Sequence, residues 1–203
     1  MYVENDYGKS VQQSAEKYFK DLDGQVLGSE GFKLEETDFR TFLIKAKDAN
    51  PDIIVLGGWP RNMGYILKQA KELNINKTFV APGGTIGPEI LEIAGQAANG
   101  LIYISEFDLN SDNEAITAFR AKYNQKYNKE PELFSAMGYD VVNIISGMLK
   151  KCGTDSVCLK DNLYQVQNYD GASGVISFDD HGDVIKPMIY MTIKDGKHIR
   201  YQP

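Results

Sequence analysis

The sequence predicts an α/β protein built around a doubly wound, mainly parallel sheet. Strand-like and helix-like segments alternate from residue 1 to residue 105, and the links between them are short. One strand-like run, Ile53–Leu56, is apolar at every position. A run without polar alternation is typical of a parallel strand that is covered on both faces. We therefore expect Ile53–Leu56 to lie centrally in the sheet.

Local patterns predict each element of residues 1–105. Residues 1–3 resemble the end of a strand, and residues 5–8 form a turn into a helix. Further strands are expected at residues 25–30, 53–56, 78–81 and 101–104. The helices between them have apolar side chains at helical spacing. These stripes are Val11, Ala15, Tyr18, Phe19 and Leu22 in the first helix, Phe39, Phe42, Leu43 and Ala46 in the second, and Met63, Ile66, Leu67, Ala70 and Leu73 in the third.

Capping residues mark several helix ends. Thr37 or Asp38 is expected to cap the second helix. Pro88 suits the first turn of a fourth helix, which should end near Gly95.

The pattern changes after Ser105, where three helices follow one another. Ser111 and Glu114 have the spacing of a capping box, and Pro131 is expected to end the first of these helices. The inward residues are Ile116, Phe119 and Tyr123 in the first helix, Met137, Val141, Ile144, Ile145 and Met148 in the second, and Leu159, Leu163 and Val166 in the third. Strands return at residues 175–178 and 189–194, separated by a polar turn at residues 179–183.

Composition excludes several classes of function. With 28 acidic and 22 basic residues the net charge is −6, which disfavours binding to nucleic acid or to an anionic membrane. The longest apolar run has seven residues, against the roughly 20 that a membrane helix needs. The sequence has no nucleophile elbow, Walker loop or dinucleotide fingerprint. We therefore expect no enzymatic activity and no cofactor.

The two cysteines, Cys152 and Cys158, leave two alternatives open. They can form a disulfide that closes a small loop between two helices in an oxidising compartment, or they can remain as two partly buried thiols. The two histidines, His181 and His198, do not complete a recognisable zinc site with them. No metal site is expected.

The first residues do not have the pattern of a secretory signal. They start at the end of a strand, so we expect the chain to begin inside a structural unit. A complete domain with a short ordered first strand is the alternative.

A candidate binding site follows from the strand order. Ligands of open parallel sheets bind beyond the carboxyl ends of the strands. Tyr7 and Trp59 are aromatic residues with polar groups at two such ends, and Gly83 belongs to a glycine-rich loop, residues 82–87, at a third. This combination suits a small, partly apolar molecule. The alternatives are that both rings merely cover loop ends, and that the glycine-rich loop holds an anion.

Several motifs in order resemble one family, the type I periplasmic solute-binding proteins, and within it the Leu/Ile/Val-binding branch of ABC transporter components. They are Tyr7-Gly8, Glu36-Thr37-Asp38-Phe39-Arg40, Pro51-Asp52-Ile53-Ile54-Val55 with Gly57-Gly58, Leu67-Lys68-Gln69-Ala70, Ala97-Ala98-Asn99-Gly100, Ala136-Met137-Gly138-Tyr139-Asp140, and Ser177-Phe178-Asp179-Asp180-His181-Gly182-Asp183.

This resemblance implies two flavodoxin-like lobes that close on a ligand. Residues 1–105 and 185–203 would form lobe 2, one complete lobe. Residues 106–184 would be a helical return segment of lobe 1, whose remaining part is missing. The helices of residues 112–166 would then lack the sheet on which they normally pack.

The resemblance also implies the site residues. Tyr7, Trp59 and Phe134 match ligand-contacting aromatic positions, whereas Gly83 stands where the family has the acidic partner of a ligand ammonium group. Glu106 or an acid of the missing part could replace that partner, or the ligand has no amine.

The implied function is capture of a small, partly apolar ligand, such as a branched-chain or other hydrophobic amino acid or a related carboxylate, and its delivery to an ABC permease. The implied location is periplasmic or extracellular, and a lipid anchor in the missing N-terminal part is compatible with it. The alternative is a ligand-sensing domain of a receptor or regulator. Because half of the clamp is missing, we expect this chain alone to bind its ligand weakly.

Overall fold

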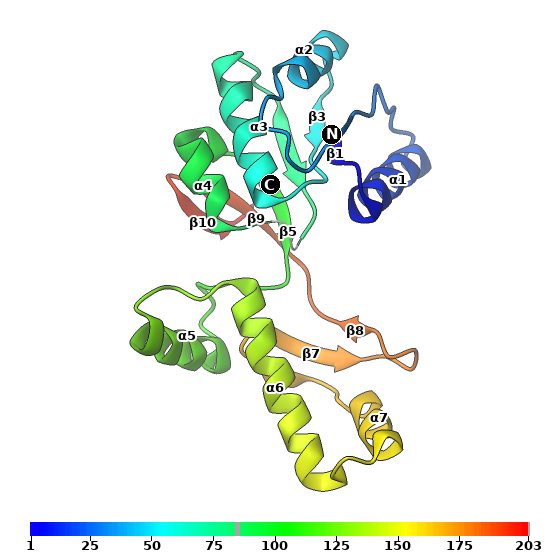
Figure 1. Ribbon diagram of the computed structural model, residues 1–203, viewed down its shortest axis with the longest axis vertical. Helices are drawn as coiled ribbons and strands as arrows, with labels where there is room; N and C mark the ends of the chain where they lie inside the picture. Colours follow the sequence, from blue (N-terminus) through cyan, green and yellow to red (C-terminus); the bar gives the residue numbers. More distant parts are fainter. Residues whose placement is uncertain (84–85, 203) are drawn as a thin grey trace. The chain divides into compact units, whose positions relative to one another are not determined.

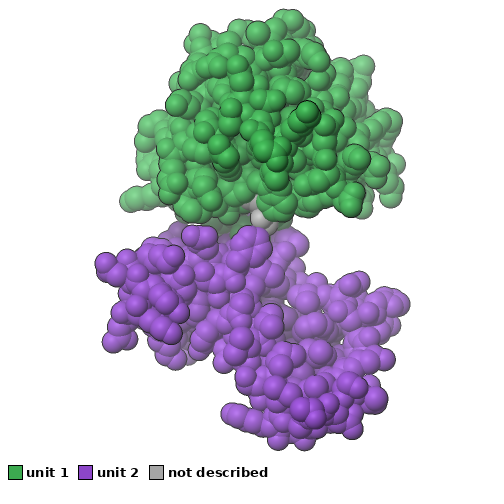
Figure 2. Space-filling view, in the orientation of Figure 1, with its two compact units in different colours: residues 1–105, 190–203 green, residues 106–189 purple. Residues whose placement is uncertain are grey.

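A computed structural model describes residues 1–83 and 86–202 of the chain, which form two compact units (Figure 2). Unit 1 consists of Met1–Ser105 and Tyr190–Pro203, and unit 2 consists of Glu106–Ile189. The chain therefore returns to unit 1 at residue 190, a few residues after the expected position 185. The assignment of these units to lobes of a larger protein stays a prediction.

Unit 1 contains a sheet in the order β10-β9-β5-β4-β3, in which β3, β4 and β5 are parallel and β9 and β10 are antiparallel (Figure 1). A parallel pair, β1 and β2, continues this sheet beside β3, because Tyr2 bridges to Gly57. The strands in its described residues are β1 (Tyr2–Val3), β2 (Gly31–Phe32), β3 (Ile53–Val55), β4 (Thr78–Ala81), β5 (Ile102–Ser105), β9 (Ile189–Lys194) and β10 (Lys197–Arg200).

The parallel strands thus follow the order 2-1-3-4-5, which is that of a flavodoxin-like doubly wound sheet. The strand β3 lies between β1 and β4, as its unbroken apolar sequence predicts. Ile54 is buried in the core of unit 1.

Four α-helices cover this sheet, namely α1 (Asp6–Asp21), α2 (Arg40–Ala49), α3 (Pro60–Glu72) and α4 (Pro88–Ala94), with a 3-10 turn η1 (Gly95–Ala98). The expected stripe of α3 is confirmed, since Met63, Ile66, Leu67 and Ala70 are all buried. Pro88 begins α4, and the helix ends next to Gly95, as expected; Gly95 itself has a positive φ of 52°.

Two expectations for unit 1 are wrong. Residues 25–30 do not form a strand, because the register of β1 and β2 pairs Tyr2 with Gly31 and leaves no residues of β1 opposite them. Tyr18 and Leu22 of the first helix are exposed, because α1 packs only its Val11, Ala15 and Phe19 side inward.

The start of α2 agrees in part with its expected form. Phe39 occupies the cap position and its own side chain caps nothing, but the neighbouring Asp38 side chain accepts a hydrogen bond from the backbone N–H of Arg40, the first residue of the helix, at 3.2 Å. In addition, the Gln69 side chain of α3 accepts a hydrogen bond from the Phe39 backbone N–H at 2.6 Å and donates one to the Thr37 carbonyl at 2.7 Å. Asp38 and a tertiary contact with Gln69 thus hold the start of α2 together.

Unit 2 contains three helices and a three-stranded antiparallel sheet in the order β6-β7-β8. The helices are α5 (Glu114–Tyr127), α6 (Leu133–Cys152) and α7 (Ser156–Tyr164), and the strands are β6 (Tyr169–Gly171), β7 (Gly174–Phe178) and β8 (Val184–Ile185). Its buried cluster contains Phe107, Ile116, Phe119, Ala136 and Ala172.

Three details of unit 2 correct the sequence expectations. Asn113, not Ser111, caps α5 by accepting a hydrogen bond from the Ile116 backbone N–H. The helix α5 ends at Tyr127, before Pro131. In α6, Val141 is 60% exposed, although the stripe predicted it to face inward.

The structure contains a disulfide between Cys152 and Cys158, which joins the end of α6 to α7. No helix in residues 1–83 and 86–202 is long and apolar enough to cross a membrane.

Candidate functional site

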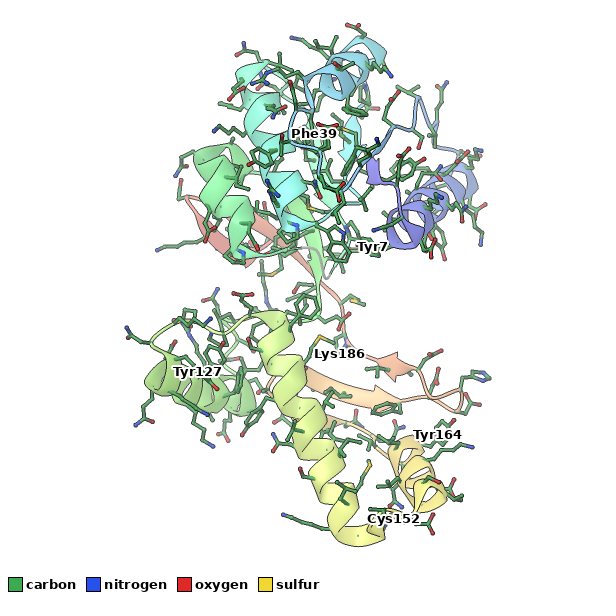
Figure 3. The ribbon with its side chains drawn as sticks, in the orientation of Figure 1. Tyr7, Phe39, Tyr127, Cys152, Tyr164 and Lys186 are labelled. Carbon is green, nitrogen blue, oxygen red and sulfur yellow. A yellow bond between two sulfur atoms is a disulfide. The ribbon has the colours of Figure 1, made fainter. Side chains whose placement is uncertain are left out.

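The link between β1 and α1 places Tyr7 at the carboxyl edge of the parallel sheet. The Asn5 side chain caps α1 by accepting a hydrogen bond from the Gly8 backbone N–H at 2.8 Å. A side chain at Gly8 would collide with the Val3 carbonyl, so glycine allows α1 to begin directly against β1. Tyr7 is therefore held in the first turn of the helix (Figure 3).

The link between β3 and α3 places Trp59 at the same edge. Gly57 and Gly58 pack closely here, since a Cβ atom on Gly58 would lie 2.9 Å from the Phe32 ring. Trp59 is the N-cap residue of α3, and Pro60 begins the helix. The backbone of Trp59 is thus held on one side by Pro60, whose φ angle is fixed, and on the other by the closely packed Gly57-Gly58.

The structure brings Tyr7 and Trp59 together. Their ring centroids are 5.2 Å apart and their planes differ by 26°, which is a stacked arrangement. Trp59 remains 38% exposed, whereas Tyr7 is half-buried beneath it. The pair therefore offers a flat, amphipathic surface of the kind that binds a small apolar group.

Gly83 lies directly after β4, at the carboxyl end of a third strand. A Cβ atom at this position would be 3.0 Å from the carbonyl oxygen of Ile104 in β5. Any side chain here, an acid included, requires the backbone to move by a few tenths of an ångström. Gly84 and Thr85, which belong to the glycine-rich loop of the anion hypothesis, lie outside the described residues.

Phe134 and Glu106, the other two residues singled out from the sequence, belong to unit 2. Phe134 lies in the first turn of α6 and is 61% exposed. The Glu106 carboxylate lies 3.9 Å from the Lys186 ammonium group. A ligand ammonium group would thus have to compete with Lys186 for Glu106.

Sequence reasoning missed a buried polar cluster around Asp140. This carboxylate is 1% exposed and accepts hydrogen bonds from the backbone N–H groups of Ala172 and Ser173 and from the Ser173 hydroxyl, each at 2.7 Å. The Lys186 ammonium group donates to the Ser173 carbonyl and hydroxyl oxygens, each at 2.8 Å (Figure 3). Burial lowers the pKa of Lys186, and the charges of Glu106 and Asp140 oppose this shift.

The signal for this cluster is a carboxylate on the inward side of a helix. Asp140 follows the buried Ala136 by four residues on α6, a position where an acid is rarely left without partners. It holds the β6–β7 turn on the helix, which is a structural role.

The two histidines belong to elements other than those that carry the aromatic pair. His198 of β10 is half-buried, and its Nδ1 is 2.7 Å from the Tyr103 hydroxyl of β5. His181 is exposed in the turn between β7 and β8. Within the described residues, no group of histidine, cysteine, aspartate and glutamate side chains could hold a metal ion.

Comparison with known proteins agrees with this arrangement. A sequence model of the family described as "Periplasmic binding protein" matches residues 1–197. A Pseudomonas aeruginosa protein named for binding leucine, isoleucine, valine, threonine and alanine is 27% identical over 188 residues, which cover 91% of this chain and 49% of that protein.

Solved structures have the same fold. A leucine-binding protein from Thermotoga maritima superposes with a TM-score of 0.89 at 29% identity, covering 99% of this chain and 59% of that one. A branched-chain amino acid transporter substrate-binding protein from Streptococcus pneumoniae, in complex with isoleucine, superposes with a TM-score of 0.86 at 31% identity. The match covers 97% of this chain and 57% of that one.

The chain spans about half the length of the curated relatives it matches. The match nevertheless extends through almost all of its own residues, and the strand order agrees with it. The chain belongs to the periplasmic binding protein family, in its type I Leu/Ile/Val-binding branch.

Proposed function

We propose that this chain supplies one ligand-binding face of an extracytoplasmic solute-binding protein. The ligand is a small, partly apolar solute, such as a hydrophobic amino acid or a related carboxylate, which the whole protein delivers to an ABC permease. The stacked pair of Tyr7 and Trp59 carries this proposal, because it presents apolar surface at the edge where parallel sheets bind ligands. The names of the matched relatives support the same class of solute.

The proposed role is binding without catalysis. His198 stands on β10, the edge strand of the unit 1 sheet on the side opposite β3, and His181 lies in an exposed turn of unit 2. The relatives that match over most of this chain are named as binding proteins. The site of action is the periplasm or the cell exterior, where a disulfide such as Cys152–Cys158 persists.

The ligand class is set in part by Gly83. This position has no side chain to pair with an ammonium group, and adding one forces a shift against Ile104. We therefore place small carboxylates without an amine alongside hydrophobic amino acids as ligands.

Nuclear magnetic resonance of the labelled chain tests the proposal. Trp59 is the sole tryptophan, so its indole N–H signal identifies the site. Titration with leucine, isoleucine and benzoate should shift this signal in wild type and leave it unmoved in Tyr7→Ala. The matched control is Tyr18→Ala, an exposed tyrosine of the same helix, which should behave as wild type. Equal shifts in both variants would remove Tyr7 from the site.

A further inference from the structure

The link between α3 and β4 contains a sequence motif that the ligand site does not use (Figure 1). Asn76-Lys77-Thr78 has the form Asn-x-Thr, the form in which asparagine accepts a sugar when the middle residue is not proline. Asn76 is the only asparagine of the sequence with serine or threonine two positions later. Because the motif is short, its exposure and its surroundings decide whether an enzyme can use it.

A fixed turn presents Asn76 to solvent. Asn74 has a positive φ of 53°, and its N–H donates to the Lys71 carbonyl at 3.1 Å. Ile75 is buried, and its N–H donates to the Ala70 carbonyl at 2.9 Å. The chain is thus anchored directly before Asn76, which is exposed. Within the described residues no hydrogen bond holds the Asn76 side chain, so its amide can react without loss of a structural contact.

The other two residues of the motif are placed to match. Thr78, the first residue of β4, is exposed. Lys77 between the two is half-buried, and its Nζ donates to the Asn50 side-chain oxygen at 2.8 Å. Both side chains that the motif requires therefore face solvent in the folded chain.

The motif lies at the opposite edge of the unit 1 sheet from the aromatic pair. Thr78 is at the amino end of β4, whereas Gly83 follows the carboxyl end of the same strand. The four residues of β4 span about 13 Å at the usual rise of a strand. Tyr7 and Trp59 stand at the carboxyl ends of β1 and β3, which are on the Gly83 side. A sugar on Asn76 would therefore leave the aromatic pair open.

We propose that Asn76 is an acceptor for an asparagine-linked oligosaccharide. The donor is an oligosaccharide carried on a lipid pyrophosphate, and an oligosaccharyltransferase outside the cytoplasm transfers it. The Asn76 Nδ2 forms a bond to the anomeric carbon of the first sugar, while the bond from that carbon to the pyrophosphate oxygen breaks. The lipid pyrophosphate leaves with the electron pair, and Nδ2 loses one proton. This inference rests on the extracytoplasmic location proposed above, with which the disulfide agrees.

Glycosylation of the folded chain in vitro tests the site. The 203-residue chain is incubated with a purified oligosaccharyltransferase that reads Asn-x-Ser/Thr and with chitobiose on a lipid pyrophosphate, and its intact mass is measured. We expect wild type to gain the mass of one chitobiose, and peptide mapping should place it on Asn76. Asn76→Gln should gain none. A standard acceptor peptide in the same tube verifies that the enzyme is active.

Variants of Thr78 provide the matched control. Thr78→Val keeps the shape of the side chain but removes the hydroxyl, so the modified fraction should fall by more than tenfold, whereas Thr78→Ser should retain it. Both positions are exposed, so these variants should fold as wild type does. An unmodified wild-type chain beside a modified acceptor peptide would overturn the inference. Equal modification of Thr78→Val would overturn it as well.

Ligand binding is measured separately on the glycosylated and the unmodified chain. The Trp59 indole N–H should respond to isoleucine equally in both. A response lost only after glycosylation would contradict the separation of Asn76 from the aromatic pair. Absence of a response in both chains would contradict the proposed function instead, and it would leave the acceptor site standing.

Discussion

Tyr7 and Trp59, which are 52 residues apart in sequence, stack with their ring centroids 5.2 Å apart. Each ring comes from the link between a parallel strand and the helix that follows it. Because β1 and β3 are neighbours, their carboxyl ends bring the two links side by side. The contact between the rings is thus a consequence of the 2-1-3 strand order.

Removing one ring of this pair should destabilise unit 1. Tyr7→Ala loses the stacking contact and its half-buried apolar area, and we expect the free energy of unfolding to fall by about 1–2 kcal/mol. Urea unfolding followed by Trp59 fluorescence measures this change. Tyr18→Ala, on the exposed side of the same helix, should change it by less than about 0.5 kcal/mol. A loss below that value in Tyr7→Ala would show that the stack contributes little.

The carboxylate of Asp140 should be essential to the stability of unit 2. Asp140→Asn retains the shape of the side chain but weakens three hydrogen bonds from Ala172 and Ser173, so we expect a loss of about 2–4 kcal/mol. Circular dichroism during urea unfolding provides the measurement. Asp161→Asn, an exposed acid on α7, is the matched control and should be near neutral. Similar stability of the two variants would contradict the assigned role.

His198 should make the chain less stable in mild acid. Burial lowers its pKa below the ordinary value of 6.5, so folding favours the neutral imidazole. This contribution is complete above pH 6.5 and is lost as the pH falls below that value toward the lowered pKa. Unfolding midpoints measured between pH 7.5 and roughly pH 5 should decline more in wild type than in His198→Phe. His181→Phe, in an exposed turn, should keep the decline of the wild type.

The exposed valines of α6 should form an apolar surface that a dye can detect. Val141 is 60% exposed and Val142 is 64% exposed on a helix of unit 2. Changing both to Ser should lower the fluorescence of a bound apolar dye and alter stability by less than about 0.5 kcal/mol. Val157→Ser on α7, where the valine is 66% exposed, tests whether any exposed valine has the same effect. Unchanged dye binding in the double variant would argue against an apolar surface on α6.

An acid at position 83 should favour ligands that carry an amine. Gly83→Glu adds a carboxylate at the edge of the sheet where the aromatic pair lies. This carboxylate should strengthen leucine binding relative to benzoate, because it forms a charge-assisted hydrogen bond worth about 1.5–3 kcal/mol with the leucine ammonium group. Gly83→Gln introduces the same crowding against Ile104 without the charge. Equal selectivity of both variants would place the amine of the ligand elsewhere.

The sequence predicts much of unit 1 because its elements depend on local patterns. The apolar run Ile53–Val55 identifies a central strand, and Pro88 and Gly95 mark the two ends of a helix. Prediction fails where a distant partner decides the structure. Asp38 bonds the first residue of α2 as expected, but the hydrogen bond of Gln69 from another helix was not foreseen, and residues 25–30 lack a neighbouring strand on the β1 side.

The same distinction applies to the site. Strand ends are visible in sequence, so Tyr7 and Trp59 could be selected without a structure. The hydrogen-bond partners of Asp140, Ala172 and Ser173, lie more than 30 residues away in sequence. The local sequence of α6 therefore does not predict them. The family resemblance added Phe134 and Gly83, and their part in binding stays a prediction.

Ligand affinity of this chain alone follows from its length. It spans about half of the curated relatives, and under the proposed function it would supply one face of a two-lobed binding site. With one face, we expect dissociation constants of roughly millimolar or weaker, a binding free energy no better than about −4 kcal/mol.

The most direct measurement is therefore a titration of the isolated 203-residue chain, observed at the Trp59 indole N–H, with isoleucine and benzoate up to roughly 50 mM. We predict a saturable shift of this signal with a dissociation constant of about 1 mM or weaker in wild type and in Tyr18→Ala, and no shift in Tyr7→Ala. Absence of any shift in wild type, or a response that survives Tyr7→Ala, would contradict a ligand site at the stacked pair.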